Sequence, residues 1–114
     1  MMTEYSLRHI DREVKSMLQI EQLKVNGKAV QGIRLLSPGG EGHPNMIVIV
    51  GEKGYLMCGY LNKDAADKFG DAAAIAGGST FEEILANPVK AVTEEAAKLG
   101  VEVGMTGAEA LERL

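Results

Sequence analysis

The sequence predicts an α+β fold, a two-layer sandwich in which helices pack on one face of a mainly antiparallel sheet. Asn26-Gly27 separates two extended stretches and is the strongest short signal for a β-hairpin. The run Met46–Val50 is apolar at every position, which is typical of a strand. Later in the chain, hydroxyl residues precede carboxylates by three positions, the spacing of capped helix starts. We therefore expect hairpin strands to form a sheet with the capped helices laid across it.

Composition predicts one globular domain. The chain has 114 residues, of which 46% are hydrophobic and 25% charged, as in ordinary globular proteins. We divide it into an N-terminal extension, residues 1–17, and a single α+β domain, residues 18–114. The net charge of -4 and the 4% aromatic content disfavour nucleic acid as a partner, because phosphates are repelled and stacking rings are few.

Two further features concern the cellular setting. The longest apolar run, Met46–Val50, is far shorter than the roughly 20 residues that span a membrane. Cys58 is the only cysteine, so it has no partner for an intramolecular disulfide, which fits a reducing compartment. We expect a cytoplasmic protein without a membrane partner.

The extension, residues 1–17, carries dense mixed charge with apolar residues at helical spacing. These apolar residues are Leu7, Ile10, Val14 and Met17. The spacing is compatible with a short amphipathic helix, which would be marginal in isolation. Two interpretations stay open: a solvated or weakly docked extension, and an arm that packs on another subunit.

The first half of the domain carries strand signals. We predict strands over residues 18–25 and 28–36, joined at Asn26-Gly27. Residues 37–45 contain three glycines and two prolines and are predicted to form a loop. The Met46–Val50 strand should be covered on both faces or lie centrally in its sheet. A turn at residues 51–54 should then lead into an antiparallel return strand over residues 55–61.

Helix signals begin at Asn62, which is placed to cap a helix over residues 63–69 that Gly70 ends. A strand is predicted over residues 72–76. Both Ser79-Thr-Phe-Glu82 and Thr80-Phe-Glu-Glu83 have capping-box spacing and predict a helix that runs to about Ala86.

The last part of the chain is predicted to be mostly helical. Asn87-Pro88 supplies a cap and a first-position proline for a helix that Gly100 stops. That helix would bury a stripe made of Leu85, Val89, Val92, Ala96 and Leu99. Residues 101–105 alternate as a short strand, and Thr106-Gly-Ala-Glu109 is a third capping box that opens a terminal helix.

Two stretches resemble a known family. They are Gly54-Tyr-Leu-Met-Cys-Gly-Tyr-Leu-Asn62 and Leu99-Gly-Val-Glu-Val-Gly-Met-Thr-Gly107, followed by the Ala-Leu ending. The chain resembles the YunC-like domain of unknown function, a family of small bacterial and archaeal proteins, over roughly residues 20–114. The resemblance implies a two-layer α+β sandwich. It implies no activity and offers no catalytic residues to carry over.

The residue best suited to covalent chemistry is Cys58. A reactive thiolate needs a nearby cation, a histidine or a helix N-terminus, and the helix opened by Asn62 follows closely. His43 is the candidate base, and His9 lies in the extension. The alternative is that Cys58 is a small buried hydrophobe and both histidines are surface residues. The distant histidines and the lone cysteine form no metal signature, and no cofactor is predicted.

Glycines before two helix starts could cradle a small anion, because free amides and the helix dipole converge there. The alternative is that the hydroxyl of each cap already satisfies those amides. Tyr60 and Asn62, which follow Cys58, complete the candidate ligand-binding residues. The full set is Gly77, Gly78, Ser79, Thr80, Gly104, Thr106, Gly107, Tyr60 and Asn62.

Two classes of function follow from these residues. The first is a small non-catalytic binding or self-assembly module, expected to be a homo-oligomer, whose strand edge and Cys-Gly-Tyr surface meet another copy or a protein partner. The second is a small enzyme that uses Cys58 as a thiol nucleophile. A sensor that binds a small anion without chemistry is a third hypothesis.

Overall fold

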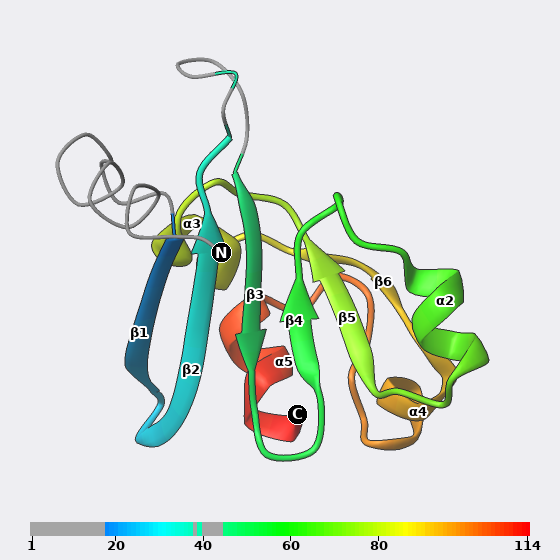
Figure 1. The fold of residues 1–114 in the computed structure, drawn as a ribbon. Coiled ribbons are helices and arrows are strands. Elements are labelled where there is room, and N and C mark those ends of the chain that lie inside the picture. The colour runs from blue at the N-terminus through cyan, green and yellow to red at the C-terminus, as the bar shows by residue number, and fades with distance from the viewer. Residues whose placement is uncertain (1–17, 38, 40–44) are drawn as a thin grey trace, which may run out of the picture.

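The computed structural model describes residues 18–37, 39 and 45–114 as one six-stranded sheet with short helices (Figure 1). The expected extension, residues 1–17, and positions 38 and 40–44 of the expected loop lie outside the described residues. The strands are β1 Leu18–Val25, β2 Lys28–Leu35, β3 Met46–Val50, β4 Tyr55–Met57, β5 Ala73–Ala76 and β6 Val89–Val92. The helices are α2 Lys63–Lys68, α3 Phe81–Ala86, α4 Glu94–Lys98 and α5 Gly107–Arg113.

The sheet follows chain order, β1-β2-β3-β4-β5-β6, and neighbouring strands are antiparallel except β4 and β5, which are parallel. A parallel pair needs a crossover connection, and α2 supplies it. The predicted α+β class with a mainly antiparallel sheet is confirmed.

The β1–β2 hairpin forms where the sequence predicts it. Asn26 and Gly27 have φ angles of 51° and 81°, the left-handed values that a type I′ turn requires at both central positions. The turn fixes an in-register ladder from Val25 opposite Lys28 to Leu18 opposite Leu35. This register decides which side chains of each strand share a face.

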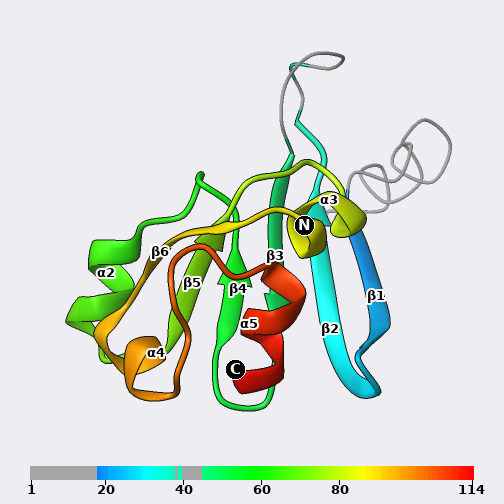
Figure 2. The same ribbon diagram turned by 180° about the vertical axis from the view of Figure 1, so that it is seen from behind.

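One face of the sheet, here called the inner face, is covered by α3, α4 and α5 (Figure 2). Alternate residues of β3, Ile47 and Ile49, are fully buried there, and Leu56 of β4 joins them. Helix α2 instead packs on the opposite, outer face, where its Ala66 contacts Met57 and Ala73. The helices therefore do not all share one face, because the β4–α2–β5 crossover leaves the sheet on the other side.

Strand β3 lies centrally in the sheet, as one of the two predicted alternatives requires. It is not covered on both faces. Met46 and Val48 on the outer face are half-buried, and Val50 is exposed. The apolar run thus continues onto a sheet face that the described helices cover only in part.

The predicted helix from Asn87-Pro88 to Gly100 is wrong in its first half. Residues Val89–Val92 form β6, which pairs with β5, and a helix exists only over Glu94–Lys98. Valines favour strands, and the edge of β5 offers Val92 a hydrogen-bonded neighbour that an isolated helix cannot match. The predicted stripe nevertheless belongs to the core.

The predicted strand over residues 101–105 is also wrong. This segment has no regular structure, although it runs beside the start of β6. The Val89 amide donates to the Met105 carbonyl at 2.7 Å, and the Gly104 amide donates to the Val89 carbonyl at 2.9 Å. Gly104 has a φ of 101°, which turns the chain before a ladder can extend.

The predicted helix caps at Asn62, Thr80 and Thr106 are confirmed. Thr106 forms the complete capping box with Glu109. The return strand β4 is shorter than predicted and ends at Met57, because the chain turns at Cys58, whose carbonyl accepts from the Leu61 amide at 3.2 Å. That early turn positions the candidate site.

Candidate functional site

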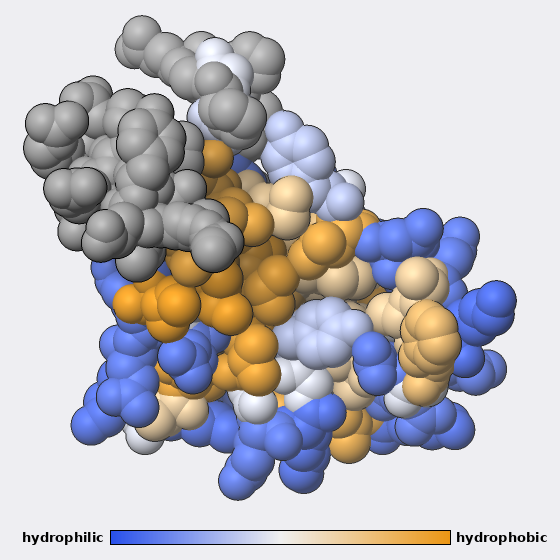
Figure 3. Space-filling model, in the orientation of Figure 1, coloured by the Kyte–Doolittle hydropathy of each residue, from blue (hydrophilic) through white to orange (hydrophobic). Residues whose placement is uncertain are grey.

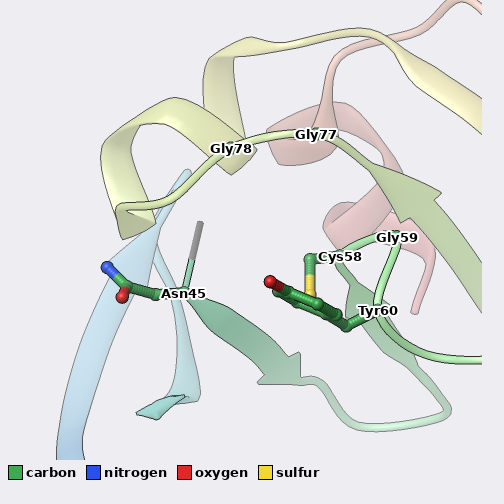
Figure 4. A pocket seen from close by; sticks show the side chains of 6 residues that line it. All are labelled: Asn45, Cys58, Gly59, Tyr60, Gly77 and Gly78. Carbon is green, nitrogen blue, oxygen red and sulfur yellow. The ribbon is translucent and has the colours of Figure 1, made fainter. Parts of the chain in front are cut away.

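A cavity of about 310 Å³ opens where β4 and β5 end (Figure 4). Three of its lining residues, Cys58, Gly59 and Tyr60, follow β4 directly. Gly77 and Gly78 follow β5, and Asn45 precedes β3. The structure thus brings Cys58, Tyr60, Gly77 and Gly78, four of the predicted site residues, around one cavity.

The topology explains why a cavity forms at this edge. Strands β4 and β5 are parallel, so their carboxyl ends meet at the same edge of the sheet. After β4 the chain passes to α2 on the outer face, and after β5 it passes to α3 on the inner face. Connections that leave neighbouring parallel strands toward opposite faces open a crevice between them, which is where ligands bind in open α/β sheets.

Cys58 forms part of the floor of this cavity. Its side chain is 4% exposed, and its Sγ accepts a hydrogen bond from the Ile47 amide at 3.3 Å. Tyr60 is 53% exposed, and Figure 4 shows its ring on the same side of the cavity as the sulfur. The two predictions for Cys58, a core residue and a site residue, are therefore compatible: the residue belongs to the core cluster and also borders the cavity.

Asn45 holds one wall of the cavity in place through two hydrogen bonds. Its Oδ1 accepts from the Ser37 amide at 3.0 Å, and its Nδ2 donates to the Ser79 carbonyl at 3.2 Å. The side chain therefore links the two ends of the predicted loop to the turn before α3. Asn45 was not among the predicted site residues, because its hydrogen bond to Ser79 joins positions 34 residues apart.

The predicted anion cradle at residues 77–80 divides into two parts. Ser79 and Thr80 serve the helix: the Ser79 amide donates to Glu83 Oε1 at 2.8 Å, and Thr80 Oγ1 accepts from the Glu83 amide at 3.1 Å. Gly77 and Gly78 line the cavity instead. Gly78 has a φ of 143°, a backbone conformation that side chains rarely adopt.

The second predicted cradle, at Gly104, Thr106 and Gly107, does not line this cavity. The Thr106 amide donates to Glu109 Oε1 at 2.8 Å, and the Gly107 amide donates to the Asn87 carbonyl at 3.0 Å. Both amides are therefore already engaged. Asn62 likewise uses its side chain to cap α2, where it accepts from the Asp64 and Ala65 amides.

His43, the candidate base for Cys58, and His9 lie outside the described residues. Within the described part of the chain, one hydrogen bond reaches the Cys58 sulfur, from the Ile47 amide. No group of three or more metal-ligating side chains occurs among the residues described. None of the described helices has the length and apolar character needed to cross a membrane.

A second feature is the apolar patch on the outer face of β1, β2 and β3, here called the outer patch (Figure 3). Ile20, Leu35 and Val50 are 55%, 44% and 41% exposed. The strand registers place the remaining members on the same face. The outer patch consists of Leu18, Ile20, Ile33, Leu35, Met46, Val48 and Val50. Helix α2 covers the neighbouring part of this face, over β4 and β5.

Comparisons with known proteins agree with the resemblance seen in the sequence. The chain is 27% identical over 103 residues to the uncharacterized protein YunC of Bacillus subtilis (strain 168), a match that covers 86% of this chain and 98% of YunC. It is similar to the crystal structure of TA1206, a protein of unknown function from Thermoplasma acidophilum. That match has a TM-score of 0.76 and 32% identity, and covers 86% of this chain and 93% of the other. The profile of the domain of unknown function DUF1805 matches residues 57–114, and the chain belongs to that family.

Proposed function

We propose that this protein is a non-catalytic self-assembly module whose copies associate through the outer patch. The observation that carries the proposal is the exposed apolar surface of β1, β2 and β3. Monomeric soluble proteins rarely expose large contiguous apolar patches, and such patches mark interaction sites. The family has no assigned function, so this proposal rests on the physical argument alone.

The position of β1 favours a second copy as the occupant. It is an edge strand of the described sheet and is 8 residues long. It carries no proline, and its ladder with β2 runs without a bulge, so it lacks two of the features by which natural proteins blunt sheet edges. Two copies related by a two-fold axis would bury the outer patch and the β1 edge together, because a two-fold interface uses the same surface on both partners.

The chemistry of the cavity gives the enzyme hypothesis less support. A thiol nucleophile needs an activating base or cation, and the hydrogen bond that reaches Cys58 Sγ within the described chain comes from a backbone amide. We therefore place self-assembly ahead of thiol catalysis. A lone buried cysteine also fits our proposal of a cytoplasmic protein.

The test is the mass of the full chain in solution, measured by light scattering after size exclusion at several concentrations. We expect an oligomer for the unaltered chain and dissociation for Ile20→Arg and Val50→Arg. Ile20 and Val50 are 55% and 41% exposed, so the arginines should leave the fold intact, while a charge buried without a partner would disrupt the interface.

Val103→Arg is the matched control. Val103 is 61% exposed but lies outside the outer patch, in the segment before α5. It should leave the mass unchanged, and circular dichroism should report the same secondary structure for all variants. A monomeric mass for the unaltered chain at every concentration, or an oligomer that survives both outer-patch variants, would contradict the proposal.

A further inference from the structure

The most exposed large apolar side chain among the described residues lies outside the outer patch. Phe69, directly after α2, is 78% exposed. It borders a cavity of about 220 Å³ between α2 and β4, here called the α2 groove, which is also lined by Tyr55, Met57 and Leu61. Apolar side chains that gather around an open hollow are typical of a contact surface.

The α2 groove is continuous with the outer patch. In the β3–β4 ladder, Met57 pairs with Val48 and Tyr55 pairs with Val50. Both valines belong to the outer patch, and paired side chains of neighbouring strands lie side by side on one face of the sheet. One apolar surface therefore runs from β1 across β3 and β4 to Phe69.

The outer patch alone is small for a stable dimer. Its most exposed members are only about half exposed, so the seven side chains offer roughly 400 Å², at about 30 Å² for each aliphatic carbon. A standard interface buries about 800 Å² on each partner. Surface from a neighbouring element must therefore join the contact, and Phe69 would add roughly 150 Å².

The shape of the outer face indicates how α2 would join. Helix α2 packs over β4 and β5, whereas no described helix covers β1 to β3 on this face. A helix is about 10 Å across, and sheets that pack face to face lie about 10 Å apart. When the uncovered strands of two copies face each other, α2 of each copy therefore reaches the level of the other sheet. A two-fold axis parallel to β2 places β1 of the second copy over β3, beside α2.

We propose that α2 of each copy packs along the β1 edge of a second copy, with Phe69 as the anchor of this contact. The inference rests on the self-assembly proposed above and adds a second contact to the outer patch. A helix laid along β1 would cover its unpaired backbone groups, which is one way in which proteins protect sheet edges. The same contact would remove the Phe69 ring from water, and buried aromatic side chains often carry much of the binding energy of an interface.

The first test is the dissociation constant of the full-length oligomer, measured by light scattering on dilution. We expect Phe69→Ala to raise this constant at least about tenfold, because it removes the anchor from both halves of the interface. Val103→Ala is the matched control, since Val103 is also an exposed apolar residue, at 61%, and lies away from α2 and β1. It should leave the dissociation constant unchanged, and circular dichroism should report the same fold for both variants.

The second test locates α2 relative to the second copy through a double variant, Phe69→Cys with Gln22→Cys. Gln22 is exposed on β1 and shares a face with Ile20. Within one chain, β1 and β4 are three strand spacings apart, about 14 Å, which is farther than a disulfide spans. A disulfide between positions 69 and 22 must therefore join two copies. Cys58, at 4% exposed, should not compete.

We expect peptide mapping after mild oxidation to find the link between positions 69 and 22. Links only between two copies of position 22 would show that the β1 edges meet each other, which would overturn the inference. An unchanged dissociation constant for Phe69→Ala, with Ile20→Arg still dissociating the oligomer, would also overturn it and leave self-assembly through the outer patch standing. A monomeric unaltered chain would instead contradict the self-assembly itself, and this inference with it.

Discussion

Glycine occupies two kinds of position in this protein, and the difference is decided by the neighbouring atoms. At Gly107, a Cβ would overlap the Ile84 carbonyl oxygen and lie 2.9 Å from Leu56 Cδ2. At Gly59, a Cβ would have nothing within 4 Å. The first glycine lets α5 approach α3 closely, whereas the second borders the open cavity.

We therefore expect Gly107→Ala to destabilise the fold by about 3 kcal/mol, because the backbone of α3 cannot yield as a flexible side chain can. Gly59→Ala should change the free energy of unfolding by less than about 0.5 kcal/mol. Urea unfolding monitored by circular dichroism measures both values. Equal stability of the two variants would show that α5 can move away from α3 without loss.

Tyr55 carries the clearest titration in the described chain. Its hydroxyl donates to Asp71 Oδ2 at 2.7 Å, and burial together with this hydrogen bond and the nearby carboxylate raises its pKa from 10.0 to about 12. A raised pKa means that the folded state favours the neutral phenol. The stabilisation is fully present below pH 10 and is lost as the pH rises toward the folded value.

The folded state should lose stability through this group between pH 10 and pH 12, because the phenol ionises at lower pH in the unfolded chain than in the folded one. Tyr55→Phe should be less stable than the unaltered chain at neutral pH and should show a shallower decline over the same interval. Urea unfolding across that pH range checks this, and phenolate absorbance of the unaltered chain follows the titration directly. A parallel decline of both proteins would contradict the assignment to Tyr55.

At the scale of secondary structure, the junction between β6 and α4 depends on Thr93. This residue is fully buried, and its Oγ1 accepts from the Ala73 amide at 2.9 Å and donates to the Asp71 carbonyl at 2.8 Å. It also accepts from the Ala96 amide as the cap of α4. One hydroxyl therefore joins a strand end, a helix start and the segment before β5.

Thr93→Val keeps the shape of the side chain and removes these hydrogen bonds. We expect a loss of about 2–3 kcal/mol in the free energy of unfolding, because buried backbone groups would be left without partners. Thr80→Val is the comparison, since its cap is exposed and should cost about 1 kcal/mol. Thermal and urea unfolding provide the two values, and a smaller loss at Thr93 than at Thr80 would contradict this explanation.

The same junction explains which helix predictions failed. The caps at Asn62, Thr80 and Thr106 depend on residues two or three positions apart. Both partners of each capping hydrogen bond can therefore be recognised in the sequence. Val89 and Val92 have helical spacing with Ala96, but they form a strand because β5 lies beside them. Hydrophobic periodicity carries no information about a strand that becomes a neighbour only after folding.

At the scale of the whole molecule, the outer patch and the cavity occupy different regions of one sheet. The outer patch lies on β1, β2 and β3, and the cavity lies at the carboxyl ends of β4 and β5. Successive side chains of a strand alternate between faces. Substitutions at Ile20 or Val50 should therefore leave the cavity intact.

The candidate site was predictable in part. Cys58, Tyr60, Gly77 and Gly78 stood out as residue types suited to chemistry or close approach of a ligand, and all four line the cavity. Asn45 did not, because its importance comes partly from a hydrogen bond to Ser79, 34 residues away in the sequence.

The α+β class, the β1–β2 hairpin and the capped starts of α2, α3 and α5 could be predicted from residues close together in the chain, because the hairpin and the caps depend on hydrogen bonds or dihedral preferences within a few residues. The tertiary structure alone decided that residues 89–92 form a strand, that α2 packs on the outer face, and that β4 and β5 end at a common crevice. These outcomes depend on which segments become neighbours in space. Apolar surface is removed from water, and the fold is stabilised, only when those segments come together in the assembled sheet.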